Sequence, residues 1–238
     1  MTRPALLLLL ITPVLYAAPV PRLTEKEQIE KNWGKVFAPS KKCEFKLDGT
    51  SLTIRSDGEA CFGFSEGADS KMPRVTNTVS GDFEVTVTVK AAATPNPDVE
   101  REDSWPWTRA GVFVTGGGHA IELHFSQFYT KFDGKLSDKL TRCVWIEGCF
   151  PDGTGGGSEQ DQVAANKSVH LRITRKEKVI TGSYSFDGKK WFSTHTPAAS
   201  GDIPDKVTVG LFVSHTTQQI VDATFADFKL GKPETTEK

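Results

Sequence analysis

The feature that most constrains the fold of this chain is an alternation of apolar and polar residues with a period of two. Over residues 83–90, four apolar side chains, the first Phe83 and the last Val89, alternate with polar ones. The same pattern recurs at Val169–Ile173 and at Val207–Val213. Side chains of a β-strand point alternately to its two faces, so each segment predicts a strand with one buried face.

Further segments carry the same alternation or are rich in β-branched and aromatic residues. They are Ser51–Arg55, Arg74–Val79, Arg109–Thr115, His119–Phe128, Thr141–Glu147, Val179–Phe186, Lys190–His195 and Ile220–Leu230. Asp187 and Gly188 tolerate the positive φ angles of a tight hairpin turn. Thr94–Pro106 and Pro151–Gln162 are rich in Pro or Gly and are expected to be loops. Strands at this density favour an all-β antiparallel sandwich or barrel.

One short helix is expected before the strands, at Thr24–Trp33. Thr24 can cap its N-terminus, and Glu27, three residues later, completes a capping box. Ile29 and Trp33 are four residues apart and therefore share one face of the helix. We expect this helix to dock on the surface of the domain.

The N-terminus has the pattern of an export signal. Arg3 precedes an apolar run from Ala5 to Leu15, and small residues for cleavage follow at 17 and 18. The run is too short to span a bilayer, and no later stretch approaches ~20 apolar residues, so no membrane span is expected. We expect a secreted, periplasmic or cell-envelope protein. Its parts are a signal peptide at 1–18, a segment with the short helix at 19–42, a β-sandwich domain at 43–230 and a polar tail at 231–238.

Export to an oxidising compartment bears on the redox state of the four cysteines. In an oxidising compartment they are expected to form two disulfides, for which three pairings exist. The pairing of sequence neighbours, Cys43 with Cys61 and Cys143 with Cys149, is the one we expect, and free thiols are the alternative. A metal site built on cysteines is not indicated, because the chain has no C-x-x-C and no paired His motif.

Composition excludes several classes of protein. Lys and Arg number 29 against 30 Asp and Glu, which gives a formal charge of -1, and no basic run occurs. Nucleic-acid binding requires a basic surface and is not expected. Aromatic residues make up 10% of the chain, which together with the near-zero net charge argues against intrinsic disorder.

Residues 75–230 resemble the DUF1349 family in the order and spacing of several motifs. The matching segments are Gly81–Val85, Arg109–Val114, Leu171–Arg175, Ser185–Trp191, Val209–Val213 and Ala223–Phe228. The resemblance implies a concanavalin A-like jelly roll, in which two curved antiparallel sheets pack face to face. Many such domains bind carbohydrate on the concave sheet or in edge loops. The family has no settled activity, so the resemblance implies a fold more firmly than a function.

Most catalytic signatures are missing from the sequence. Jelly-roll glycosidases of the laminarinase type carry E-x-D-x-x-E on one strand face, and no such string occurs here. Within the expected strand His119–Phe128, however, Glu122 and His124 are neighbours on the polar face. A carboxylate beside an imidazole can transfer protons, bind sugar hydroxyls or hold a metal. The alternative is an ordinary solvated strand face.

Tryptophan residues give the positive evidence for a binding site. Trp105 and Trp107 precede the strand that begins at Arg109, and Trp145 lies near the Gly-rich segment. Sugar rings stack their C–H faces on indole rings, and their hydroxyls need polar partners. The predicted ligand site consists of Trp105, Trp107, Arg109, Glu122, His124 and Trp145. The alternative is that these indoles seal the end of the sandwich core.

Three functions are compatible with these observations. We expect a non-catalytic protein that binds carbohydrate or polysaccharide. A structural or protein-interaction domain of the cell envelope is one alternative, and a glycoside-active enzyme centred on Glu122 and His124 is another. No cofactor is expected. A structural Ca²⁺ suits a jelly roll, but its ligands are not assigned, since acidic residues such as Asp98, Asp152 and Asp161 have no diagnostic spacing.

Overall fold

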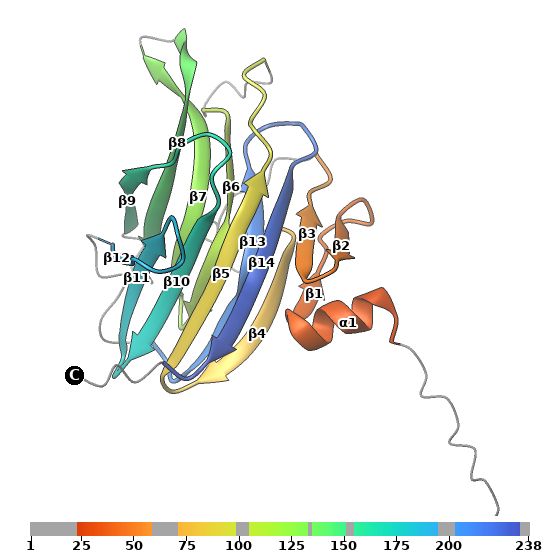
Figure 1. The fold of residues 1–238 in the computed structure, drawn as a ribbon, viewed down its shortest axis with the longest axis vertical. Coiled ribbons are helices and arrows are strands. Elements are labelled where there is room, and N and C mark those ends of the chain that lie inside the picture. Colours follow the sequence, from red (N-terminus) through yellow and green to blue (C-terminus); the bar gives the residue numbers. More distant parts are fainter. Residues whose placement is uncertain are drawn as a thin grey trace, which may run out of the picture.

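Two antiparallel sheets of seven strands each lie face to face in the computed structural model (Figure 1). The structure describes residues 23–58, 71–98, 105–132, 135–150, 155–194 and 203–233. The expected signal peptide at 1–18 lies outside these ranges. Within them, no helix combines the length and the apolar character needed to cross a bilayer.

The strands of both sheets come from distant parts of the chain. Sheet A has the order β1 (Lys35–Phe37), β4 (Arg74–Ser80), β13 (Lys206–His215), β6 (Trp107–Gly116), β7 (His119–Phe132), β8 (Lys135–Cys149) and β9 (Gly155–Gln162). Sheet B has the order β12 (Phe192–Ser193), β11 (Val179–Ser185), β10 (Val169–Lys176), β5 (Phe83–Ala92), β14 (Asp222–Gly231), β3 (Ser51–Arg55) and β2 (Glu44–Asp48). The predicted antiparallel β-sandwich is confirmed.

The hydrophobic core lies between the sheets and contains the predicted alternating rows. Its residues from β5, β10 and β13 are Phe83, Val85, Val87, Val89, Val169, Leu171, Ile173, Val207, Val209, Leu211 and Val213, each at most 2% exposed. Burial of one such side chain stabilises the fold by roughly 1.5–3 kcal/mol. These rows therefore hold the two layers together.

Sheet A is also buried on its outer face, near its centre. Phe113 on β6 and Phe212 on β13 lie there in edge-to-face contact, with ring centroids 6.2 Å apart. They belong to a second apolar cluster with Met72 and Ala120. The central strands of sheet A are thus buried on both sides, and any polar side chain among them must find a partner within the protein or in a ligand.

The predicted helix is confirmed as α1 (Glu25–Asn32). Thr24 caps it, and its reciprocal hydrogen bonds with Glu27 complete the capping box. Ile29 is 1% exposed, and the indole of Trp33 stacks on the ring of Phe228 of β14, with centroids 5.6 Å apart. The helix docks on the edge of the sandwich beside β1 and β2 (Figure 1).

Strand β9 corrects the expectation that Pro151–Gln162 is a loop. Residues 155–162 of this Gly-rich segment pair antiparallel with β8 at the edge of sheet A. A Cβ at Gly155 would lie 2.6 Å from the carbonyl oxygen of Gly148, and one at Gly157 would lie 2.3 Å from Nε1 of Trp145. Glycine is needed here for the close approach of the strands, so its presence does not signal a turn.

Short strands account for two further differences from the sequence prediction. β1 pairs with β4, so the sandwich includes residues 35–37, which precede the expected domain boundary at 43. Of the expected strand Lys190–His195, the described residues form only β12, whose two residues pair with β11 across the predicted Asp187-Gly188 turn, and His195 lies outside the described ranges. Strands of two or three residues are too short to show a period, so their ends depend on tertiary pairing.

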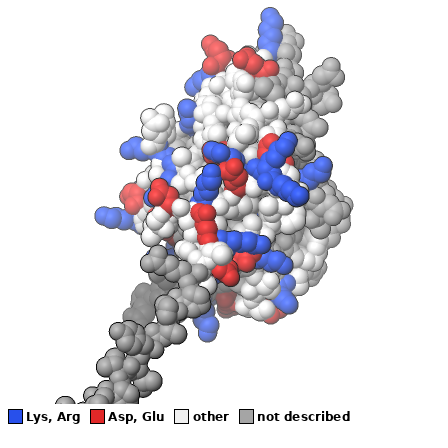
Figure 2. All heavy atoms as spheres, turned by 90° about the vertical axis from the view of Figure 1, so that its right-hand side faces the viewer, with Lys and Arg blue, Asp and Glu red and all other residues white. Residues whose placement is uncertain are grey.

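The edge of the sandwich near α1 carries mixed charges. In Figure 2, Lys and Arg side chains intermingle with Asp and Glu over this face. Arg55 of β3 donates two hydrogen bonds to Asp222 of β14, at 2.7 and 2.8 Å, and lies 3.5 Å from Glu44. Such exposed pairs contribute little to stability, and this face offers no basic surface of the kind that nucleic acids require.

The expected Cys143–Cys149 disulfide is wrong. Both residues lie on β8, six positions apart, so the rise along the strand separates them by about 20 Å. A disulfide requires the Cα atoms to lie within about 7 Å. Among the described residues Cys43, Cys143 and Cys149 are free thiols, and Cys61, the expected partner of Cys43, lies outside the described ranges.

Substitution of Gly210 by Ala is expected to lower the free energy of unfolding by roughly 1–3 kcal/mol, because of overpacking. A Cβ at this position of β13 would lie 1.9 Å from the carbonyl oxygen of Val75 and 2.9 Å from the ring of Phe113. Urea unfolding followed by circular dichroism measures the change. Gly156→Ala is the matched control, because its Cβ would meet nothing within 4 Å. Equal stability of the two variants contradicts the prediction.

Candidate functional site

Strand alternation places a set of polar and aromatic side chains on the outer face of sheet A. On β6, β7 and β8 the core residues Val112, Leu123 and Ile146 point inward. Their sequence neighbours therefore point outward. In register these form three rows across the strands: Arg109, Ser126 and Cys143; Gly111, His124 and Trp145; Phe113, Glu122 and Glu147.

Three of these outward residues form what we call the carboxylate–histidine cluster: Glu122, His124 and Glu147. Glu122 is 2% exposed and His124 is completely buried. One potential metal-ligating atom from each of the three residues lies within 4.8 Å of the other two. Glu122 pairs directly with Glu147 in the register of β7 and β8, and His124 follows two residues along β7. Two carboxyl groups and an imidazole thus converge at one point.

Arg109 joins this cluster from the neighbouring strand. Its Nη1 donates a hydrogen bond of 2.6 Å to Oε1 of Glu147 and forms an ion pair with it. Because Arg109 is on β6 and Glu147 on β8, the arginine side chain crosses β7 to reach the carboxylate. Its guanidinium carbon also lies 4.1 Å from the ring centroid of Trp107, a cation–π geometry.

His124 is an uncharged imidazole at neutral pH. Burial lowers its pKa well below the ordinary value, and the positive charge of Arg109 lowers it further. Neither ring nitrogen has a hydrogen-bond partner among the described residues. The ring makes an edge-to-face contact with Phe212, with centroids 6.0 Å apart. On β6 the facing residue is Gly111, where a Cβ would lie 2.5 Å from Cβ of His124, so glycine leaves the imidazole its place.

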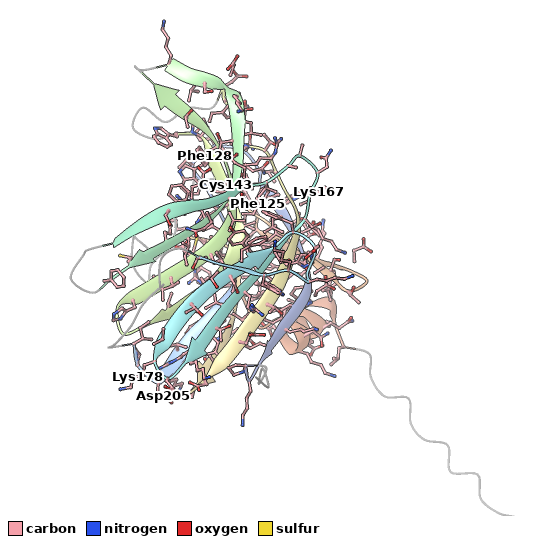
Figure 3. The ribbon with its side chains drawn as sticks, turned by 60° about the vertical axis from the view of Figure 1, so that its left-hand side comes forward. Phe125, Phe128, Cys143, Lys167, Lys178 and Asp205 are labelled. Atoms are coloured by element: carbon pink, nitrogen blue, oxygen red, sulfur yellow. The ribbon has the colours of Figure 1, made fainter. Side chains whose placement is uncertain are left out.

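Next to the cluster is a group of aromatic side chains that we call the aromatic rim: Trp105, Trp107, Phe128 and Trp145. The ring of Phe128 lies 6.2 Å from that of Trp105 and 6.4 Å from that of Trp145, the latter in an edge-to-face arrangement. Trp105 is 48% exposed. Phe128 and Cys143 lie toward one end of the sandwich, whereas Lys178 and Asp205 mark the other end (Figure 3).

Thr216 fixes the position of the chain that carries the first two indoles. Its hydroxyl donates to the carbonyl of Trp105 at 2.6 Å and accepts from the N–H of Trp107 at 3.0 Å. Its own N–H donates to the carbonyl of Trp107 at 3.1 Å. Thr216 is 2% exposed, so these bonds hold the segment against the end of β13.

The structure brings the six predicted site residues together on one side of sheet A. Arg109, Glu122, His124 and Trp145 lie in adjacent rows, and Trp107 contacts Arg109. Trp107 and Trp145 point away from the core residues of β6 and β8, which argues against the alternative that the indoles seal the core. Whether the six residues bind a ligand stays a prediction.

Glu147 and Phe128 belong to this site but were not predicted from the sequence. Glu147 ends the expected strand Thr141–Glu147, and Phe128 ends the strand that carries His124. Only the register of β7 with β8 places Glu147 opposite Glu122. Residues 133–134 of the connection between these strands are Asp-Gly, a strong hairpin motif. The register shifts between Tyr129 and Lys131, however, so a register counted from that turn would have placed Trp145 opposite Glu122 in place of Glu147.

The outer face of sheet B has a hollow of about 460 Å³. Its lining includes Glu84, Thr88, His170, Arg172, Trp191 and Asp227. The Thr88 hydroxyl donates to Asp227 at 3.0 Å and lies 2.9 Å from Nδ1 of His170. The guanidinium carbon of Arg172 lies 4.1 Å from the ring centroid of Trp191. Trp191 is the one indole that lines this hollow, and the guanidinium of Arg172 is stacked on it.

Comparison with known proteins establishes the fold and no closer relationship. No protein-family model matches the chain, and no curated protein matches its sequence. A functionally unknown protein from Saccharomyces cerevisiae has a similar structure, with a TM-score of 0.58 and 17% identity over 89% of this chain and 100% of that one. The VIP36 exoplasmic/lumenal domain in its Ca²⁺/Man2-bound form gives a TM-score of 0.50, 13% identity and coverages of 82% and 81%.

The alginate lyase from Klebsiella pneumoniae is a further match, with a TM-score of 0.49 and 12% identity over 79% of this chain and 84% of that one. At these identities the likeness concerns the fold alone. The expected concanavalin A-like jelly roll is thereby confirmed.

Cys143, in the row of Arg109 and Ser126, is expected to resist alkylation in the native protein. It is completely buried, and burial raises the pKa of its thiol to about 12. The thiolate is the reactive form, so almost none is present at pH 8. Iodoacetamide labelling with peptide mass spectrometry, with and without urea, measures this reactivity. Rapid native labelling of Cys143, or a peptide in which Cys143 is linked to Cys149, contradicts the expectation.

Proposed function

We propose that this protein is an exported, non-catalytic jelly roll that binds carbohydrate at the aromatic rim of sheet A. One observation carries the proposal: three indoles and Phe128 gather on the sheet face that points away from the core, beside Arg109 and Glu147. The order of its sequence motifs further supports placing the chain in the DUF1349 family, and the N-terminal apolar run supports export.

The chemistry of the rim suits a saccharide. Indole rings bind the apolar C–H faces of a sugar by stacking, and the exposed ring of Trp105 is accessible for such a contact. Arg109 and Glu147 are each about one-fifth exposed, so a donor and an acceptor for sugar hydroxyls lie beside the rings. The hydrogen bonds of Thr216 hold the indoles in place before a ligand arrives, which lowers the entropic cost of binding.

The similar solved structures give this proposal a context. The VIP36 domain shares the fold and was solved with Man2 bound. Sheet B is a weaker candidate for the same role, because a single indole lines its hollow, whereas three indoles gather on sheet A. We therefore assign saccharide binding to sheet A.

Burial argues for recognition over catalysis at this site. A general acid or base must come within hydrogen-bond distance of the reacting atom. Glu122 and His124, the two groups best suited to that role, are 2% and 0% exposed. A bound saccharide would contact the rim and the exposed part of the Arg109–Glu147 pair before it reached either group.

A glycoside-active enzyme is the second candidate function. The convergence of two carboxyl groups with a neutral imidazole favours it, because such a set can transfer protons. Incubation with a glycan panel, followed by assays for reducing ends and unsaturated products, tests this alternative. Product release that is lost in Glu122→Gln would replace the binding proposal with this one.

Replacing Trp105 and Trp107 by Ala is expected to weaken binding roughly tenfold or more for each indole, as is common for tryptophans that anchor a ligand. A glycan array, with and without EDTA, first identifies a polysaccharide that the wild-type protein binds. Affinity electrophoresis in gels containing that polysaccharide then compares the variants. Circular dichroism shows whether each variant keeps the fold.

Trp191→Ala is the matched control for this experiment, because it removes an indole from the outer face of sheet B. Retention that is lost with both sheet A variants and kept with Trp191→Ala supports the proposal. Retention that is lost only with Trp191→Ala places the site in the hollow of sheet B and contradicts the proposal. Absence of retention on every glycan in the wild-type protein also contradicts it.

A further inference from the structure

The carboxylate–histidine cluster presents more buried polar atoms than the described protein satisfies. His124 is 0% exposed, and both of its ring nitrogens lie without a hydrogen-bond partner among the described residues. Buried polar atoms in native proteins nearly always have a partner in the protein, in water or in a ligand. An imidazole with two unsatisfied nitrogens is therefore the sign of a missing partner.

The neighbours of His124 define the chemistry of that partner. Carboxylate oxygens of Glu122 and Glu147 and a ring nitrogen of His124 lie within 4.8 Å of one another. In a tetrahedral Zn²⁺ site, with metal–ligand bonds of about 2.0–2.2 Å, two ligand atoms lie about 3.3–3.6 Å apart. To bind one ion, the three side chains must therefore draw closer together by rotation. Carboxyl groups accept hydrogen bonds or bind cations, and one cation can bind a carboxylate oxygen of each glutamate together with one ring nitrogen of His124.

We propose that Glu122, His124 and Glu147 bind one first-row transition-metal dication, of which Zn²⁺ is the representative. The three ligands come from β7 and β8, whose pairing fixes their spacing. Such a site ties the polar faces of the two strands together near the aromatic rim. It adjoins the proposed saccharide site and shares Glu147 with it, whereas Glu122 and His124 are buried and belong to the metal site alone.

The ligand set selects the class of metal. One imidazole nitrogen and two carboxylate oxygens suit Zn²⁺ and its first-row neighbours. Ca²⁺ takes six to eight oxygen ligands, and Mg²⁺ prefers oxygen ligands with several waters. Three donors that include a nitrogen, two of them on buried residues, do not meet either requirement. Cys143 lies one row away but is not part of the set, so the site has no thiolate.

Arg109 supports the geometry of the site. Its hydrogen bond of 2.6 Å to Oε1 of Glu147 fixes the orientation of that carboxylate. A carboxylate has two oxygens, so Glu147 can keep this bond and also contribute to a metal. Hydrogen bonds from a second layer of residues commonly orient metal ligands in this way. Arg109 is thus a positioning residue for the metal site.

The test begins with protein stripped of metal by EDTA and then dialysed. Calorimetric titration with ZnCl₂ is expected to show one site per chain, and Zn²⁺ is expected to raise Tm, because a ligand that binds only the folded state stabilises it. Refolding from urea in the presence of Zn²⁺, followed by gel filtration and metal analysis, provides a second route for loading a buried site. Failure of both routes to yield about one Zn²⁺ per chain overturns the proposal.

Two variants and one control assign the site. His124→Asn and Glu147→Gln are each expected to weaken Zn²⁺ binding at least tenfold and to remove the rise in Tm. His170→Asn on sheet B is the matched control and is expected to bind as the wild type does, because His170 is bonded to Thr88 on the opposite layer. Binding that survives in both cluster variants, or that is lost in the control alone, overturns the proposal.

A spectroscopic measurement on the wild-type protein keeps the proposal testable if a variant does not fold. Co²⁺ in place of Zn²⁺ gives visible absorption bands that report the number and type of its ligands. Bands of a low-coordinate nitrogen and oxygen site support the proposal. Absence of such bands after refolding with Co²⁺, or binding of Ca²⁺ with no binding of Zn²⁺ or Co²⁺, contradicts it.

Discussion

The central strands of sheet A are buried on both faces, and this constraint governs the rest of the molecule. Their inner residues complete the core with sheet B, and their outer residues include Phe113 and Phe212, which exclude water from the opposite side. Polar groups on these strands thus lie in a medium where an unsatisfied donor or acceptor is costly. A glutamate and a histidine at the middle of β7 require a specific arrangement of partners. Glu147, which Arg109 holds by a hydrogen bond, lies beside them, but neither ring nitrogen of His124 has a partner among the described residues.

The fold could be predicted from the sequence because sheet-on-sheet packing imposes a period of two on long strands. The rows of β5, β10 and β13 show that period, and the capping box of α1 shows the start of the helix. The polar pair Glu122 and His124 could be placed on one face by the same rule. These features are local, and a local pattern is enough to specify them.

What could not be predicted depends on register and on close approach between strands. Glu147 becomes part of the site only because β8 pairs with β7 in one particular alignment. The glycines of β9 have the sequence pattern of a loop. In the structure they allow the backbone of β9 to lie close to Gly148 and to the indole of Trp145. The separation of Cys143 from Cys149 follows from the length of β8, which begins six residues before the predicted segment and ends two residues after it. Pairing between distant segments decides each of these points.

The side chain of Arg109 has a consequence for how the two parts of this face behave together. Its guanidinium group stacks on the ring of Trp107 and also donates a hydrogen bond to Glu147. A ligand that moves the Arg109 guanidinium at Trp107 also changes the hydrogen bond that orients the Glu147 carboxylate. A metal ion bound to Glu147 in turn changes the position of the guanidinium against Trp107. By thermodynamic linkage, a saccharide at the aromatic rim and a metal ion at the carboxylate–histidine cluster then change each other's binding affinity by the same factor.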